Sequence, residues 1–156
     1  RPGNVDEKKQ LEITINTILK NSRKLPVIFP VHPRTAIILK ELSFEADNLF
    51  LTNPLGYLDF NYMVQNAKAV LTDSGGITEE TTVLDVPCLT LRDNTERPET
   101  VSLGTNKIVG TNPETIGKAL EFLFDQNWKK GKVPNLWDGK AAKRIIEKLL
   151  NLNTSV

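Results

Sequence analysis

Several features that mark particular protein classes are scarce in this chain of 156 residues. It has one cysteine, Cys88, and one histidine, His32. These counts exclude a disulfide framework, a cysteine-based zinc site and a histidine-clustered metal site. Lys and Arg together number 20 and Asp and Glu number 19, so the formal net charge is only +1. That balance argues against a non-specific nucleic-acid binder and against a protein held to membranes by surface charge.

Long apolar runs are missing as well. No run approaches the roughly 20 residues of a membrane span, and residues 1–7 lack the apolar core of a signal peptide. We therefore expect a cytoplasmic protein in a reducing environment, with no membrane and no nucleic acid as partner. The chain does have 39% apolar and 25% charged residues, enough for a globular core. Its length fits one domain, residues 1–156.

Segments with helical periodicity or helix-start signals alternate with short apolar segments along the chain. Helices are expected at residues 6–20, 35–42, 57–66, 75–84, 96–103, 113–124 and 139–150. Strands are expected at residues 26–31, 48–52, 69–72, 88–91 and 106–109. Because these strands are short and rich in Val, Leu and Ile, they fit a parallel sheet covered on both faces. We predict an α/β fold, a doubly wound, Rossmann-like parallel sheet flanked by helices.

The order of the expected elements has one unusual feature. The first element is a helix, with Asp6 as its expected N-cap, whereas a doubly wound domain normally begins with its central strand. This order suggests that the sequence is a piece of a larger protein.

The strongest local signal is DSGGITEE at residues 73–80, between the end of an expected strand and the start of a helix. Open α/β sheets bind ligands at such places. Gly75 and Gly76 let a ligand approach the backbone, and the free N–H groups of a helix start favour phosphate. The Ser74 hydroxyl can cap the helix or bind a phosphate oxygen. A plain tight turn with a capping serine is the alternative interpretation.

Two adjacent glutamates follow in the same helix. Glu79 and Glu80 point roughly 100° apart around the helix axis, so they are expected to do different jobs. One carboxylate could accept hydrogen bonds from both hydroxyls of a ribose. The alternative for either is stabilisation of the helix dipole.

A second charged segment, RDNTERPE at residues 92–99, follows the next expected strand. It is either a solvated loop or a site where an arginine forms a fork to phosphate. His32 also follows a strand, and either a structural or a functional role is open to it. Phe60 is either a core residue or a stacking platform for a base.

Together these motifs resemble the non-hydrolysing UDP-N-acetylglucosamine 2-epimerases. Residues 73–80 are similar to that family's DSGGxxEE segment, residues 92–99 to its RDxTERPE segment and residues 30–33 to its PVH segment. The resemblance covers only the C-terminal half of a GT-B-type enzyme with two Rossmann-like halves. Arg1 is similar to the arginine of the His-Arg motif that opens that half.

The resemblance implies an isomerase that interconverts UDP-N-acetylglucosamine and UDP-N-acetylmannosamine by eliminating UDP and adding it back. We expect no cofactor and no metal. By resemblance, Ser74, Gly75 and Gly76 hold the diphosphate, Glu80 binds the ribose hydroxyls and Phe60 lies near uracil.

The remaining implied roles divide the reaction between the two halves. Arg97 is the catalytic residue of this half, because it neutralises charge on the departing pyrophosphate. His32 belongs to a neighbouring second UDP-sugar site that regulates bacterial members. The carboxylates that move the C2 proton lie in the other half. We therefore expect the isolated chain to bind UDP without turnover, and the full-length protein to be a homodimer.

Two other functions remain open from the residues. One is the donor-binding half of a GT-B glycosyltransferase, but Pro87 and Cys88 stand where many retaining members carry the second of two spaced glutamates. The other is a non-enzymatic ligand-sensing module. A receiver domain of that kind needs an acidic pair after its first strand, which is not visible here.

Overall fold

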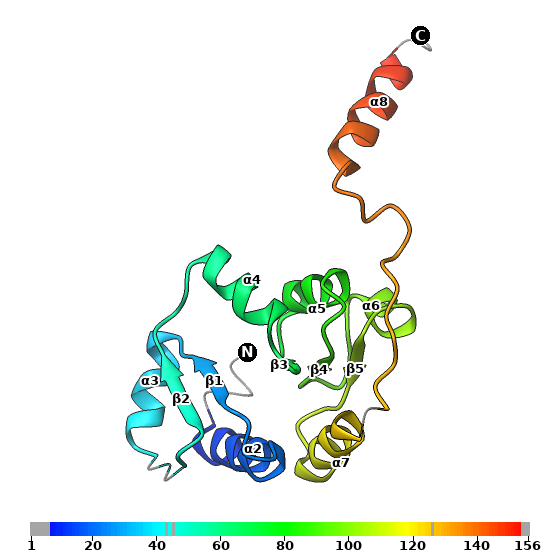
Figure 1. Cartoon of the computed structure of the whole chain (residues 1–156). Helices are drawn as coiled ribbons and strands as arrows, with labels where there is room; N and C mark the ends of the chain where they lie inside the picture. Colours follow the sequence, from blue (N-terminus) through cyan, green and yellow to red (C-terminus); the bar gives the residue numbers. More distant parts are fainter. Residues whose placement is uncertain (1–6, 43, 45, 126, 154–156) are drawn as a thin grey trace.

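The computed structural model describes residues 7–42, 44, 46–125 and 127–153, and it confirms the alternation of helices and strands (Figure 1). The helices are α2 (Lys8–Asn21), α3 (Pro33–Lys40), α4 (Tyr57–Gln65), α5 (Gly75–Val83), α6 (Pro98–Ser102), α7 (Pro113–Phe124) and α8 (Ala141–Asn153). The strands are β1 (Val27–Pro30), β2 (Leu49–Thr52), β3 (Val70–Thr72), β4 (Cys88–Thr90) and β5 (Asn106–Ile108). The expected N-cap Asp6 and the motif residue Arg1 lie outside the described residues.

All strand pairs are parallel, but they form two sheets rather than the expected one. β1 pairs with β2, and β3, β4 and β5 form the second sheet in that order. In the doubly wound order 3-2-1-4-5-6, the strand that comes first in sequence lies between the second and the fourth. The two sheets match the two sides of that order. β1 and β2 correspond to its second and third strands, and β3, β4 and β5 correspond to its fourth, fifth and sixth. No strand of the described ranges lies between them.

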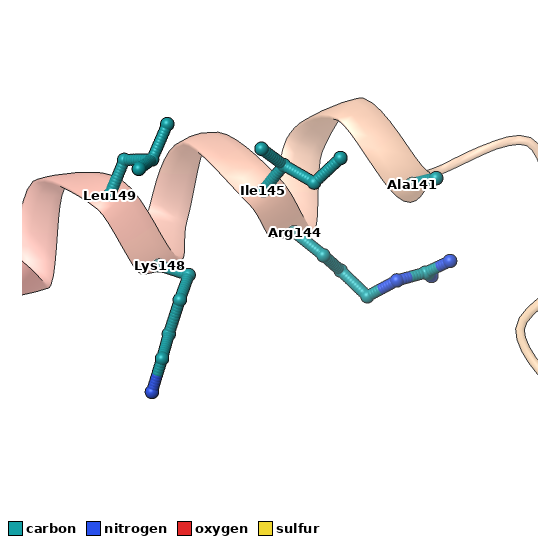
Figure 2. A pocket seen from close by; sticks show the side chains of 5 residues that line it. All are labelled: Ala141, Arg144, Ile145, Lys148 and Leu149. Atoms are coloured by element: carbon teal, nitrogen blue, oxygen red, sulfur yellow. The ribbon is translucent and has the colours of Figure 1, made fainter.

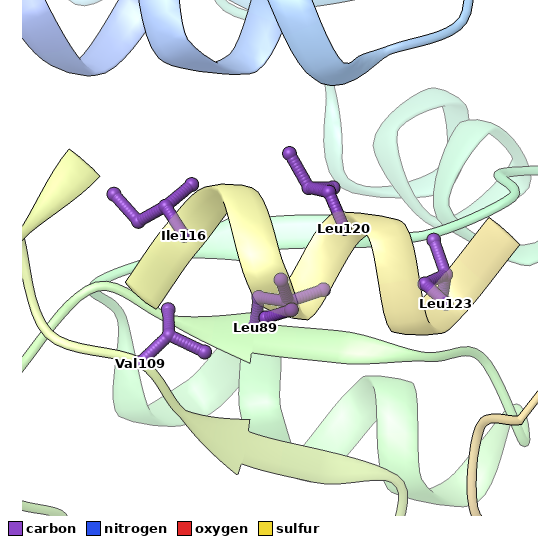
Figure 3. Close-up of a cluster of buried hydrophobic side chains, with 6 residues drawn as sticks. Leu89, Val109, Ile116, Leu120 and Leu123 are labelled. Carbon is purple, nitrogen blue, oxygen red and sulfur yellow. The ribbon is translucent and has the colours of Figure 1, made fainter. Parts of the chain in front are cut away.

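The larger sheet carries one hydrophobic core. Ile116, Leu120 and Leu123 form a stripe on α7 and pack against Leu89 of β4 (Figure 3). Their spacing of four and three residues places them on one helix face. Val109, just after β5, completes the contact. β4, at the centre of this sheet, is therefore buried along its whole length.

A second core lies beneath β1 and β2. Leu11 and Ile15 of α2 pack there with three further buried residues, Val31, Leu39 and Leu42. This sheet is covered less completely than the larger one: the side chains of Ile28, Phe50 and Leu51 are about half exposed. The expectation that all strands are buried on both faces is therefore wrong for β1 and β2.

Helix α2 connects the two cores. Its Ile18 packs against the first cluster, whereas Leu11 and Ile15 belong to the second. Polar contacts add to this bridge: the Gln10 side chain donates to the Thr111 carbonyl at 3.1 Å. The apolar stripe of the amphipathic helix α2 thus packs against both clusters.

Helix α8 projects away from the rest of the described chain on an extended segment (Figure 1). Its apolar residues are exposed, namely Ile145, Ile146, Leu149, Leu150 and Leu152. Among the described residues, no helix has the length and apolar character needed to cross a membrane.

Candidate functional site

The candidate site is built on the carboxyl ends of two neighbouring strands. β3 ends at Thr72 and α5 begins three residues later at Gly75. β4 ends at Thr90, and the loop that follows leads to α6 at Pro98. Because β3 and β4 are parallel and paired, both loops leave from the same edge of the sheet.

The glycine pair forms the first turn of a helix and not a separate turn. Gly75 and Gly76 are the first two residues of α5, and Ser74 occupies the N-cap position. The Ser74 side chain makes no capping hydrogen bond and is exposed. Of the two roles open to Ser74, the structure therefore does not use the capping one, and the hydroxyl is available to a ligand.

Neither glycine is required by the fold. Left-handed φ angles occur at Gly110 and Gly139 and not at this pair. A Cβ added to Gly75 would meet nothing within 4 Å, and one on Gly76 would meet only the Ser74 hydroxyl, at 3.9 Å. The pair thus leaves open space over the backbone N–H groups of the helix start, where helix geometry favours an anion.

Arg97 reaches this helix from the second loop. Its Nε donates to Glu79 Oε1 at 2.5 Å, and its Nη1 donates to the Glu96 carbonyl at 3.2 Å. The backbone of Arg97 is held on both sides, because its N–H donates to Thr95 Oγ1 at 3.0 Å and its carbonyl accepts from Thr100 Oγ1 at 2.7 Å. The bond to Glu79 raises the pKa of Arg97 above its ordinary value, so the guanidinium stays charged.

The structure distinguishes the two arginines of this loop. The Arg92 side chain is only 9% exposed and its Nη2 bonds Asn94 and Glu96, at 3.2 and 3.0 Å. The Arg97 side chain is 44% exposed. Arg92 therefore braces the loop, and Arg97 is the arginine that a phosphate can reach.

Glu80 lies one helical turn after Gly76 and on the same face of α5. Its Oε2 is buried and has no hydrogen-bond partner among the described residues. Buried carboxylate oxygens are normally satisfied, so this atom is an acceptor to which no described residue donates. That state fits the expected binding of hydroxyl donors.

Phe60 and His32 lie on other elements. Phe60 is half-buried in α4. His32 is exposed at the N-cap of α3, where its Nδ1 accepts from the Arg34 N–H at 3.3 Å. This contact accounts for a structural role of His32, and the roles in uracil binding and in regulation stay predictions.

Comparison with known proteins decides the family. Residues 1–150 match the family model of UDP-N-acetylglucosamine 2-epimerase. The chain belongs to this family. It is 41% identical over 155 residues to the UDP-N-acetylglucosamine 2-epimerase of Methanocaldococcus jannaschii, an alignment that covers 94% of this chain and 41% of that protein. The match favours the epimerase interpretation over the glycosyltransferase and ligand-sensing alternatives.

Solved structures agree with the sequence comparison. The M. jannaschii epimerase in complex with UDP-GlcNAc and UDP superposes with a TM-score of 0.80 at 40% identity, over 97% of this chain and 43% of that one. The Neisseria meningitidis epimerase bound to UDP-GlcNAc gives 0.83 at 32% identity, with the same coverage. The chain thus has the fold of the matching part of these GT-B-type epimerases, and it spans about two-fifths of their length.

Two surface hollows lie elsewhere on the chain. One is lined only by residues of α8, as Figure 2 shows, namely Ala141, Arg144, Ile145, Lys148 and Leu149. The other runs along β5 and α7, between Lys107 and Phe122. A hollow on a single helix has no opposite wall, so it cannot enclose a ligand. Neither hollow includes a residue of the α5 start, so the candidate site there is placed by the open helix start and the Arg97 contact.

One residue of this site had no specific role from the sequence. Glu79 was expected only to differ from Glu80, and its contact with Arg97 joins positions 18 residues apart. The available signal was its spacing, because Glu79 lies four residues after Gly75 and thus on the same helix face. Among the described residues, no three His, Cys, Asp or Glu side chains come together as a metal site.

Proposed function

We propose that this chain is the UDP-binding half of a UDP-N-acetylglucosamine 2-epimerase. The whole protein interconverts UDP-N-acetylglucosamine and UDP-N-acetylmannosamine by eliminating UDP and adding it back. One observation carries the proposal. The start of α5 has two glycines that the fold does not require, and Arg97 contacts the same helix. Family membership and the UDP-containing relative support it.

Each part of the nucleotide has a matching group in this proposal. The N–H groups at Gly75 and Gly76 and the Ser74 hydroxyl bind the diphosphate, because a helix N-terminus attracts anions. The Glu80 carboxylate, whose buried Oε2 has no partner among the described residues, accepts the ribose hydroxyls. Phe60 lies near uracil.

Arg97 supplies the catalytic contribution of this half. When UDP leaves the sugar, negative charge develops on the departing diphosphate. A guanidinium fixed beside that charge stabilises the transition state more than the bound substrate. Since the carboxylates that move the C2 proton belong to the other half, the isolated chain binds UDP and does not turn over substrate.

Further expectations about the whole protein remain part of the proposal. They are a cytoplasmic location, a homodimer, and a second UDP-sugar site that includes His32. The part of the relatives that this chain does not span, about three-fifths of their length, leaves room for the catalytic carboxylates.

Isothermal calorimetry with UDP tests the binding site. We expect the native chain to bind UDP and Arg97→Ala to bind it at least about tenfold more weakly, because a charge-assisted fork to phosphate is lost. Arg144→Ala is the matched control, since Arg144 pairs with Asp138 on the segment leading to α8. Equal heats for native protein and Arg97→Ala would contradict the proposed site.

A coupled epimerase assay tests the division of the reaction. We expect no conversion of UDP-N-acetylglucosamine by the isolated chain at any protein concentration that gives UDP binding. Clear activity of the isolated chain would show that the assignment of proton transfer to the other half is wrong.

A further inference from the structure

We propose that Glu79 is a positioning residue for Arg97: it binds the Nε–H of the guanidinium so that the remaining N–H groups at the Nη end face the diphosphate. This inference rests on the proposed function of the site. It assigns a role to the carboxylate that Arg97 contacts, which binds no part of the nucleotide in the proposed function.

The hydrogen bonds of Arg97 leave most of its donors available. A guanidinium has five N–H groups in one plane. Within the described part of the chain, Nε uses one with Glu79 and Nη1 uses one with the Glu96 carbonyl, at 2.5 and 3.2 Å. The remaining donors, including both on Nη2, can point to phosphate oxygens in a fork.

Helix geometry places the Glu79–Arg97 contact near the start of α5. Glu79 follows Gly75 by four residues, so both lie on one face of α5, about 6 Å apart along the axis. Helical side chains lean toward the N-terminus, so the Glu79 carboxylate points toward the helix start. The guanidinium that it holds is therefore directed to the face that Gly75 leaves bare.

Stability of the fold does not explain this ion pair. The side chains of Arg97 and Glu79 are 44% and 37% exposed, and exposed ion pairs contribute little to folding. A carboxylate beside a diphosphate site also repels the ligand. Orientation of the arginine is the benefit that offsets this repulsion.

Neighbouring acids provide a control for charge alone. Glu99 acts on Arg97 through its charge, whereas Glu79 acts first through a hydrogen bond and then through charge. Glu99→Ala therefore removes a negative charge near Arg97 and keeps the hydrogen bond between Glu79 and Arg97. Glu79→Gln removes the charge and keeps an amide oxygen that can accept from Nε.

The experiment compares UDP, followed by calorimetry, with uridine, followed by ligand-observed NMR. We expect Glu79→Ala to weaken UDP binding about fivefold to tenfold and to leave uridine binding unchanged, because uridine lacks the diphosphate. Glu79→Gln should keep most of the UDP affinity, and Glu99→Ala should not weaken it. In an Arg97→Ala background, adding Glu79→Ala should cause no further loss.

Several outcomes would overturn the inference. They are an unchanged UDP affinity in Glu79→Ala, an equal loss for uridine, or a loss that persists without Arg97, as a general structural role would give. If the native chain binds no UDP, or Arg97→Ala binds it normally, the proposed function fails and the inference falls with it. If Arg97→Ala weakens UDP and Glu79→Ala does not, only the inference fails.

Discussion

Gly75 and Gly104 show that glycine can be present for different reasons at two positions near one site. A Cβ at Gly75 would enter open space. A Cβ at Gly104 would lie 2.7 Å from the Thr100 carbonyl oxygen and would also clash with the Thr82 side chain. Packing therefore requires glycine at 104, whereas at 75 the fold would accept a side chain.

This difference gives a prediction for the paired variants. Gly75→Ala should keep or slightly raise the thermal stability, because alanine favours helix, and should weaken UDP binding about tenfold by filling the space above the helix start. Gly104→Ala should cost roughly 1 to 3 kcal/mol, as overpacking does. Calorimetric melting and UDP titration of both variants check this. A Gly75→Ala protein that binds UDP normally would contradict a ligand role for that glycine.

Cys88 gives a second prediction at the scale of one residue. Burial raises the pKa of its thiol from the ordinary value of 9.0 to about 11, although bonds to Thr81 and Thr90 oppose the rise. Between these values the unfolded thiol ionises and the folded thiol does not, so stability is full below pH 9 and falls as pH rises toward 11. The loss is roughly 2 to 3 kcal/mol.

Urea unfolding of native protein and Cys88→Ala at pH 8 and pH 10.5 measures this effect. The native protein should lose more stability over that interval than the variant, which has no thiol to ionise. Thiol-labelling reagents should react slowly in the folded state and quickly in urea. An equal pH dependence of the two proteins would show that the thiol is not buried as described.

At the scale of elements, a buried chain of polar side chains ties two strands to α6. Thr90 of β4 donates to Asn106 Oδ1 at 2.6 Å, and Asn106 of β5 donates to Thr100 Oγ1 at 3.0 Å. Thr100 in turn donates to the Arg97 carbonyl. The sheet thereby fixes the backbone of the residue that contacts α5.

Breaking this chain should affect both stability and binding. Asn106→Ala leaves Thr90 and Thr100 without their buried partner and should cost about 2 to 4 kcal/mol, a lost bond plus an uncompensated polar group and a small cavity. It should also weaken UDP binding, because Thr100, whose hydroxyl donates to the Arg97 carbonyl, loses the side chain that fixes it to the sheet. Urea unfolding and UDP titration check this. Asn53→Ala, an exposed loop position, should stay within about 0.5 kcal/mol of native.

The elements were predictable from sequence because their signals are local. Apolar spacing and Pro113 at a helix start gave the bounds of α7. The Glu79–Arg97 contact could not be predicted, because it depends on how two loops leave the sheet. Asn106 was expected only as a strand residue, since its buried bonds depend on the strand register. Local periodicity gives the elements, and the partners across elements need the fold.

On the scale of the whole molecule, two cores and two sheets are held together mainly through α2. It packs along α7, and Arg23, just after its end, pairs with Asp125 at 2.7 Å. The contact joins the flanks of a doubly wound sheet whose middle strand the described residues do not contain. We propose that residues 1–156 nevertheless form one domain with α8 as an appendage, because α2 contributes to both cores.

Helix α8 gives the last prediction, because it lies outside this arrangement. It has 13 residues, and its apolar side chains are exposed. An isolated helix of that length is marginal in water, so α8 gains little from the body and the body gains little from it. A variant that ends at Asp138 should therefore keep its melting temperature within about 1 °C and bind UDP as the whole chain does, by calorimetry. A fall of several degrees would show that the exposed stripe packs on the body in solution. Ile145→Lys in the intact chain separates the two cases, since a charge on an unpacked face should leave the melting temperature unchanged.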